Sequence, residues 1–101
     1  MNEIIVFKLV TGEELIASVV SEGADYTTVK NPAVIVMQQT QNGVGVGLMP
    51  FMPYSSGDIK IRNSGIVSLA TADVKMVNEY NRLFGSGIEV VPASALAGLQ
   101  M

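Results

Sequence analysis

Turn-forming residues divide this chain into short apolar stretches at fairly even spacing. The breaks fall at Thr11-Gly12, residues 21–25, Asn42-Gly43 and residues 55–58. The stretches between them are rich in β-branched residues, which is typical of strands. Asn-Gly between two such stretches is a strong hairpin signal. The sequence therefore predicts five antiparallel strands, over residues 4–10, 14–21, 26–39, 44–52 and 59–69.

Alternating glycines in the fourth stretch indicate a strongly curved sheet. Val44, Val46 and Leu48 share one face of the expected strand, whereas Gly45 and Gly47 fall on the other. Glycines on one face permit tight curvature or the close approach of another backbone. The alternative is a weakly packed, exposed face. Curvature favours a small barrel over a flat sandwich.

Two positions are expected to interrupt the long strands. Asn31-Pro32 lies inside the third stretch, and proline has no N–H to donate to a neighbouring strand. This predicts a bend or bulge at that point. Residues 63–65 read Asn-Ser-Gly and indicate a kink in the fifth stretch.

One helix is expected after the strands. Thr71 is the predicted N-cap and Gly85 the predicted end. Val74, Val77, Tyr80 and Phe84 recur at helical spacing. The helix, over about residues 71–84, is amphipathic and is expected to lie on its own sheet or at an interface. Residues 1–85 then form a small, strongly bent, five-stranded antiparallel barrel with one C-terminal helix, and residues 86–101 form a flexible or interface tail.

The composition predicts an assembly of identical copies. The 101 residues make one domain, of which 49% are apolar and 15% charged. The first and third stretches are apolar on both faces. A small domain buries a smaller share of its surface on folding than a large one does. Surplus apolar area usually ends in a subunit interface. An open, bent sheet also leaves two unpaired edges, whose head-to-tail pairing can close a ring.

Several classes of function are excluded or disfavoured. The chain has no Cys and no His, which removes thiolate nucleophiles, imidazole bases and the usual zinc ligands. The carboxylates of Glu13, Glu14, Glu22 and Asp25 have no partner base or cofactor loop in the sequence pattern. We therefore expect no enzyme activity and no cofactor. No apolar run approaches the ~20 residues of a membrane span. The start of the chain lacks a basic signal-peptide region, so a cytoplasmic location is expected.

The order of several motifs resembles that of the Sm-like (LSm) family, small proteins that form rings and bind RNA. Leu9 and Gly12, the stretch 15–20, Asp25, and Asn31 with Val34 follow the order of the first family motif. Ile61-Arg62, with Gly65 further on, resembles the second. The resemblance covers about residues 4–70. The expected helix follows the strands, whereas the family helix usually precedes them. The chain also resembles uncharacterised Sm-like proteins of cyanobacterial phages, which would place it in the host cytoplasm.

The resemblance implies a set of residues that bind single-stranded nucleic acid. The candidates are Asn31, Arg62, Tyr26, Asp25, Lys30, Lys60 and Asn63. The Asn31 amide would read a base edge, and the Arg62 guanidinium would stack on a base or hold phosphate. Asp25 would brace its loop, Tyr26 would stack, and the lysines would meet phosphate.

Each of these roles has a simpler alternative. Asn31 before Pro32 is a common turn former. Arg62 and Lys60 alternate with isoleucines and fit an ordinary solvated strand face, and Tyr26 fits strand packing. The net charge of −3 disfavours non-specific nucleic-acid binding, although a ring repeats each cation around its axis.

Two functional hypotheses follow. The first is a homo-oligomeric ring that binds single-stranded nucleic acid, RNA in preference to DNA, in RNA or DNA processing. The second is a structural or adaptor module, which a phage could encode, acting through protein partners. Its candidate docking patch contains Met49, Phe51, Met52 and Tyr54, and these residues also fit a barrel rim.

Overall fold

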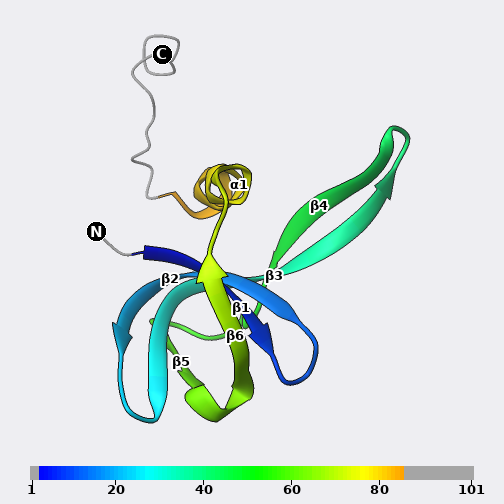
Figure 1. Cartoon of the computed structure of the whole chain (residues 1–101). Helices are drawn as coiled ribbons and strands as arrows, with labels where there is room; N and C mark the ends of the chain where they lie inside the picture. Colours follow the sequence, from blue (N-terminus) through cyan, green and yellow to red (C-terminus); the bar gives the residue numbers. More distant parts are fainter. Residues whose placement is uncertain (1–2, 86–101) are drawn as a thin grey trace, which may run out of the picture.

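A computed structural model describes residues 3–85 of the chain (Figure 1). Within that range the elements are β1 (Glu3–Leu9), β2 (Glu14–Glu22), β3 (Tyr26–Thr40), β4 (Gly43–Pro50), β5 (Ile59–Arg62), the 3-10 turn η1 (Asn63–Gly65), β6 (Ile66–Thr71) and α1 (Val74–Phe84). The tail expected over residues 86–101 lies outside the described residues.

All strand pairs are antiparallel, and β3 is the longest strand of the sheet. The strand order is β4-β3-β2-β1-β6, and β5 pairs with the first part of β3. β3 therefore bends, because its first residues pair with β5 and its last residues with β4. The expected mainly-β, strongly bent barrel with a C-terminal helix is confirmed. The expected fifth strand is divided into β5 and β6 by η1, where residues 63–65 predicted a kink.

A β-bulge interrupts β3 where the sequence predicted one. Ile16 pairs with Ala33, but Ser18 pairs with Lys30, so β3 holds one extra residue there. Asn31 has a φ of 51°, the left-handed conformation that asparagine tolerates better than most residues. The predicted bend at Asn31-Pro32 is confirmed.

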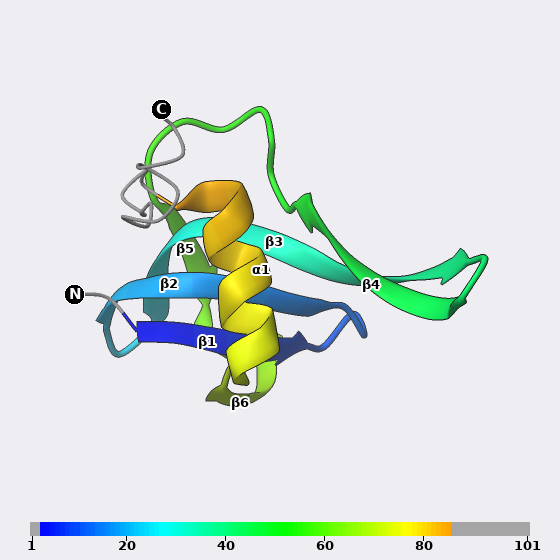
Figure 2. The same ribbon diagram turned by 90° about the horizontal axis from the view of Figure 1, so that it is seen from above.

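The two apolar faces of the sheet bury separate clusters. The inner cluster fills the barrel and contains Ile5, Phe7, Leu9, Leu15, Ala17, Val29 and Ile61. The outer cluster lies under α1 and contains Ile16, Ala33, Ala72 and Tyr80, with Ile4, Val6, Ile35 and Leu48 packed against it. Figure 2 shows α1 lying across this outer face of the sheet. The second apolar face expected from the sequence is thus covered, in part, by the chain's own helix.

The helix begins later than the sequence predicted. Asp73 is the N-cap, because its Oδ1 accepts a 2.9 Å hydrogen bond from the backbone N–H of Met76. Thr71, the expected cap, is instead the last residue of β6. Gly85 ends the helix as predicted, and its N–H donates to the Asn81 carbonyl at 2.7 Å. The difference arises because β6 continues to Thr71 alongside β1, where Ile5 is its partner.

The far half of the β3–β4 hairpin, residues 36–47, projects away from the barrel and is called the arm (Figures 1 and 2). A Cβ built on Gly47 would lie 2.8 Å from Nε2 of Gln38, so the Gln38 side chain occupies the space that glycine leaves. On the other face of the arm, Met37 pairs with Val46, and these side chains are 75% and 46% exposed. The alternating glycines therefore admit a neighbouring side chain, and the valine face is left open.

Candidate nucleic-acid interface

The pairing of β3 with β5 brings two aligned rows of side chains to the barrel surface. Tyr26 pairs with Arg62 and Thr28 with Lys60. The residues that alternate with them are Thr27, Val29, Ile59 and Ile61, which point inward and are buried or half-buried. The outer row therefore presents an aromatic ring and two cations on one face. The guanidinium carbon of Arg62 lies 5.0 Å from the centroid of the Tyr26 ring, within cation–π range.

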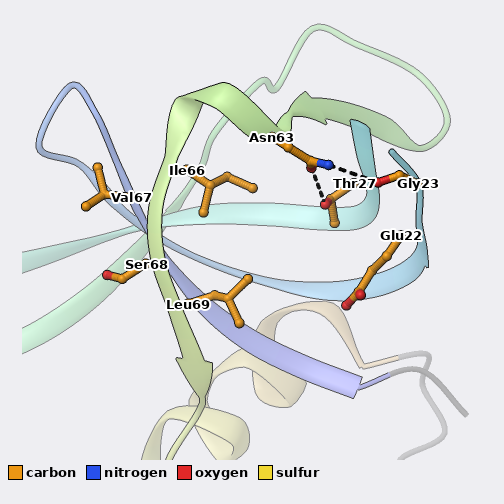
Figure 3. Close-up of a pocket in the computed structure, with 8 residues that line it drawn as sticks. All are labelled: Glu22, Gly23, Thr27, Asn63, Ile66, Val67, Ser68 and Leu69. Atoms are coloured by element: carbon orange, nitrogen blue, oxygen red, sulfur yellow. Dashed lines mark hydrogen bonds between the residues drawn. The ribbon is translucent and has the colours of Figure 1, made fainter. Parts of the chain in front are cut away.

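Asn63 fixes the neighbouring β2–β3 loop. Its Nδ2 donates to the carbonyl oxygen of Gly23 at 2.9 Å, and its Oδ1 accepts from Thr27 Oγ1 at 2.7 Å (Figure 3). Nδ2 also donates to the carbonyl oxygen of Ala24, at 3.2 Å. The backbone N–H of Asn63 donates to the carbonyl of Asp25 at 2.8 Å. The turn η1 and the β2–β3 loop are thereby held as one unit. We call this unit, with the outer row beside it, the loop site, comprising residues 22–28, 60, 62 and 63.

Two open cavities flank the loop site. One, of about 340 Å³, is lined by Glu22, Gly23, Thr27, Asn63 and residues 66–69 of β6 (Figure 3). The other, also of about 340 Å³, is lined by residues 21–26 with Thr28 and Lys60. The surroundings carry both signs of charge, because Glu22 and Asp25 lie near Lys60 and Arg62. The cations are therefore suited to local contacts with a ligand rather than to a wide basic surface.

Five of the seven candidate residues meet at the loop site, and two do not. Asp25, Tyr26, Lys60, Arg62 and Asn63 are joined by the contacts above. Asn31 is exposed and lines a different cavity, of about 280 Å³, with Pro32, Pro50, Ile59 and Phe84 among its walls. Lys30 lies beside Asn31 at the bulge, and its carbonyl accepts a hydrogen bond from Tyr80.

Sequence reasoning missed the part that Thr27 and the carbonyls of residues 23 and 24 take in the site. Thr27 is 6% exposed and gives its hydroxyl hydrogen to Asn63. The signal for it was a polar side chain at an inward position of an alternating strand. No comparable signal exists for a backbone carbonyl, whose direction depends on the loop conformation.

Only some of the residues in the docking patch considered from the sequence are exposed. Phe51 is half-buried and packs against the inner cluster. Met49, Met52 and Tyr54 remain exposed, and Tyr54 fully so, at 101%. The loop after β4 thus anchors one aromatic residue and presents the other side chains to solvent.

The bent antiparallel sheet, with a 3-10 turn between its last two strands, defines a small β-barrel domain with an exposed loop site. The chain belongs to the Sm-like family, because the model of the Sm-like domain matches residues 6–81. The match includes most of α1, which follows the strands. The family commonly forms rings and binds RNA. No curated protein matches the chain.

In the described part of the chain, α1 is the only helix other than the short η1, and it is not long and apolar enough to cross a membrane.

Proposed function

We propose that this chain forms a homo-oligomeric ring that binds single-stranded RNA at the loop site, in RNA or DNA processing. The observation that carries the proposal is the stacked Tyr26–Arg62 pair beside Lys60 on an exposed face of the barrel. Membership of a family that commonly forms rings and binds RNA supports it. Single-stranded DNA is the competing ligand, because it offers the same kinds of bases and phosphates to these side chains.

The side chains of the outer row suit a flexible, single-stranded ligand. Tyr26 is 39% exposed, so part of its ring is open to a base, and aromatic faces bind bases by stacking. Arg62 extends that planar surface and can hold a phosphate with its free N–H groups. Lys60, two residues away on the same face, adds a second phosphate contact.

Asn63 has a positioning role in this proposal. Both atoms of its amide group already bond within the protein, to Thr27 and to the β2–β3 loop. A base would have to displace those bonds to be read by the amide. Asn63 therefore holds the loop and η1 together, which fixes Arg62 relative to Tyr26.

Two free strand edges supply the ring contact. Among the described strands, β6 pairs only with β1, and β5 only with β3. β6 carries no charged side chain, and its Val67 and Leu69 are 63% and 57% exposed. Pairing β6 of one copy with β5 of the next satisfies both edges and, when the rotation closes, gives a ring. The ring repeats Arg62 and Lys60 around one axis, which offsets the net charge of −3 locally.

Fluorescence anisotropy with U-rich and A-rich RNA oligonucleotides, and with DNA of the same sequences, tests the proposal at low and moderate salt. Wild-type protein is expected to bind RNA, with affinity falling as salt rises. Arg62→Ala should weaken binding and lower the salt slope by about one. The matched control is Arg82→Ala, because Arg82 lies on α1 and pairs with Glu79. Absence of binding at micromolar protein in low salt overturns the proposal.

The adaptor hypothesis remains the alternative, favoured by the exposed Met49, Met52 and Tyr54. It predicts protein partners whose recovery on the immobilised chain survives nuclease treatment and is lost on Tyr54→Ala. Recovery that nuclease abolishes would instead assign those partners to a shared RNA.

A further inference from the structure

The arm is a long uncharged projection on a charged protein. Residues 31–57 contain no Asp, Glu, Lys or Arg, and they are the longest uncharged stretch in the part of the chain described here. The arm nevertheless extends into solvent (Figures 1 and 2). Its Met37, Val44 and Val46 side chains are 75%, 59% and 46% exposed. All three lie on the face that continues from Ile35 and Leu48 beyond the cover of α1.

The outer edge of β4 carries backbone groups with no partner strand in the described structure. β4 is the last strand in the sheet order. Thr40 and Gly43 flank a two-residue turn and form a bridge, so they are a hydrogen-bonded pair, and hydrogen-bonded pairs then alternate along the hairpin. Gly45 and Gly47 accordingly bond inward to β3. The N–H and C=O groups of Val44, Val46 and Leu48 point to the free edge.

This edge lacks the features that usually protect an exposed strand. Charged side chains, prolines and bulges normally block edge-to-edge pairing. In β4 no residue is charged, the single proline is the last residue, Pro50, and the β3–β4 register runs without a shift. The edge is therefore free of bulges, neutral and open over most of its length.

We propose that two copies of this chain pair through their β4 edges, antiparallel and about a twofold axis at Val46. Val46 then lies opposite its own counterpart, and Val44 lies opposite Leu48 of the other copy. These three positions are those whose backbone groups face the edge, so each opposed pair can exchange two hydrogen bonds. The side chains on that face form a continuous apolar row, Met37–Val46 of one copy against Val46–Met37 of the other. On the opposite face Gly45 meets Gly47, so no side chains collide.

A second copy is the partner that the charge pattern favours. A twofold contact places the same surface of two copies face to face, so a charged side chain there meets a side chain of the same charge and repels it. Of the free edges described, β5 carries Lys60 and Arg62, whereas β6, β4 and the part of β3 beyond Val34 carry no charge. The edge of β4, at 8 residues, is the longest of these uncharged edges. The proposed ring uses β6.

A cyclic ring has no twofold axis between its members, so pairing of β4 edges joins copies from two different rings. The edge pairing itself does not require the ring, and only the doubled ring rests on the proposed function.

A single cysteine tests the contact directly, because the native chain contains none. The Cα atoms of a hydrogen-bonded antiparallel pair are about 5.5 Å apart, within disulfide range. Val46→Cys is expected to give a covalent dimer under mild oxidation. Val10→Cys, at a site 65% exposed and outside the arm, is the matched control and should stay uncrosslinked. Equal crosslinking of the two variants, or none at position 46, overturns the proposal.

Val46→Pro tests the same contact without new chemistry. Proline removes an N–H that points outward, so the β3–β4 ladder keeps its bonds. Light scattering should report half the wild-type mass for this variant, with its RNA affinity unchanged. Gly45→Pro is the contrasting change, because it removes an inward N–H and should destabilise the hairpin. A wild-type mass equal to that of the Val46→Pro variant overturns the proposal. A chain that forms no ring and binds no RNA, but still crosslinks at position 46, contradicts the proposed function alone.

Discussion

The hydroxyl group of Tyr80 donates a 2.8 Å hydrogen bond to the carbonyl oxygen of Lys30, which joins α1 to the bulge in β3. The same oxygen of Tyr80 accepts a hydrogen bond from the backbone N–H of Ser18 on β2, at 3.2 Å. Tyr80 is 2% exposed, and its ring lies 5.1 Å from that of Phe84. A single helical side chain thus satisfies both strands where the bulge disturbs their pairing.

We expect Tyr80→Phe to lower the free energy of unfolding by about 1–3 kcal/mol, because the Lys30 carbonyl and the Ser18 N–H lose a buried partner. The ring packing is retained, so the loss reports the hydroxyl alone. Urea unfolding followed by circular dichroism measures it. Tyr54→Phe, at a fully exposed site, should change the stability by less than about 0.5 kcal/mol. Equal effects of the two changes would contradict a structural role for the Tyr80 hydroxyl.

The same residue predicts sensitivity to alkali. Burial raises the pKa of the Tyr80 hydroxyl above its ordinary value of 10.0. The folded state therefore holds this proton more tightly than the unfolded chain does. The contribution of the protonated Tyr80 hydroxyl to the free energy of unfolding is fully present below about pH 10, and it is lost as the pH rises through the folded-state pKa. The difference in unfolding free energy between wild type and Tyr80→Phe should shrink as the pH rises above about 10. A difference that stays constant with pH would refute this account.

Local sequence patterns predicted most of the fold because each depends on near neighbours. The β3–β4 hairpin, the bulge at Asn31-Pro32 and the amphipathic helix each follow from a few adjacent residues. The hairpin turn is Gln41-Asn42, one residue earlier than the predicted Asn42-Gly43, because Gly43 already pairs with Thr40. The predicted Thr71 cap was wrong because the pairing of β6 with β1, a contact between distant segments, decides where the strand ends. Local capping preference does not contain that information.

The loop site was only partly predictable, for a reason visible in the strand register. β3 pairs Ala33 with Pro50, and an unbroken register would place Val29 opposite Tyr54. Val29 instead pairs with Ile59, because the chain leaves the sheet after β4 and returns at β5. That excursion sets Tyr26 opposite Arg62. The length of such an excursion cannot be read from strand patterns, so the Tyr26–Arg62 stack emerges only in three dimensions.

Asn63→Ala is expected to weaken both the fold and the loop site. The change removes the bonds to Gly23, Ala24 and the buried Thr27 hydroxyl, and an unpaired buried hydroxyl costs about 1–3 kcal/mol. RNA affinity should fall as well, although the amide itself contacts no base in our proposal. Asn78→Ala, on the exposed side of α1, is the control for both thermal unfolding and anisotropy. Full stability with reduced affinity would instead indicate direct contact of Asn63 with RNA.

The two possible helix caps can be separated by mutation. Asp73→Ala removes the acceptor for the Met76 N–H and should cost about 0.5–2 kcal/mol. Thr71→Ala changes an exposed residue at the end of β6 and is expected to cost less. Thermal unfolding of the two variants decides between them. A larger loss for Thr71→Ala would favour the cap that the sequence alone predicted.

Leu69→Asp should dissociate the ring while leaving each barrel folded. Leu69 is 57% exposed on the free strand β6, and it lines the cavity beside Asn63. A carboxylate there must lose solvent when the neighbouring β5 arrives, which opposes the contact. The particle mass from light scattering should fall to that of a single copy or of a pair joined by β4 edges, with an unchanged circular dichroism spectrum. RNA affinity should fall too, because one copy offers only one Arg62. Tight binding by a dissociated variant would show that a single loop site is sufficient and that the ring is not needed for recognition.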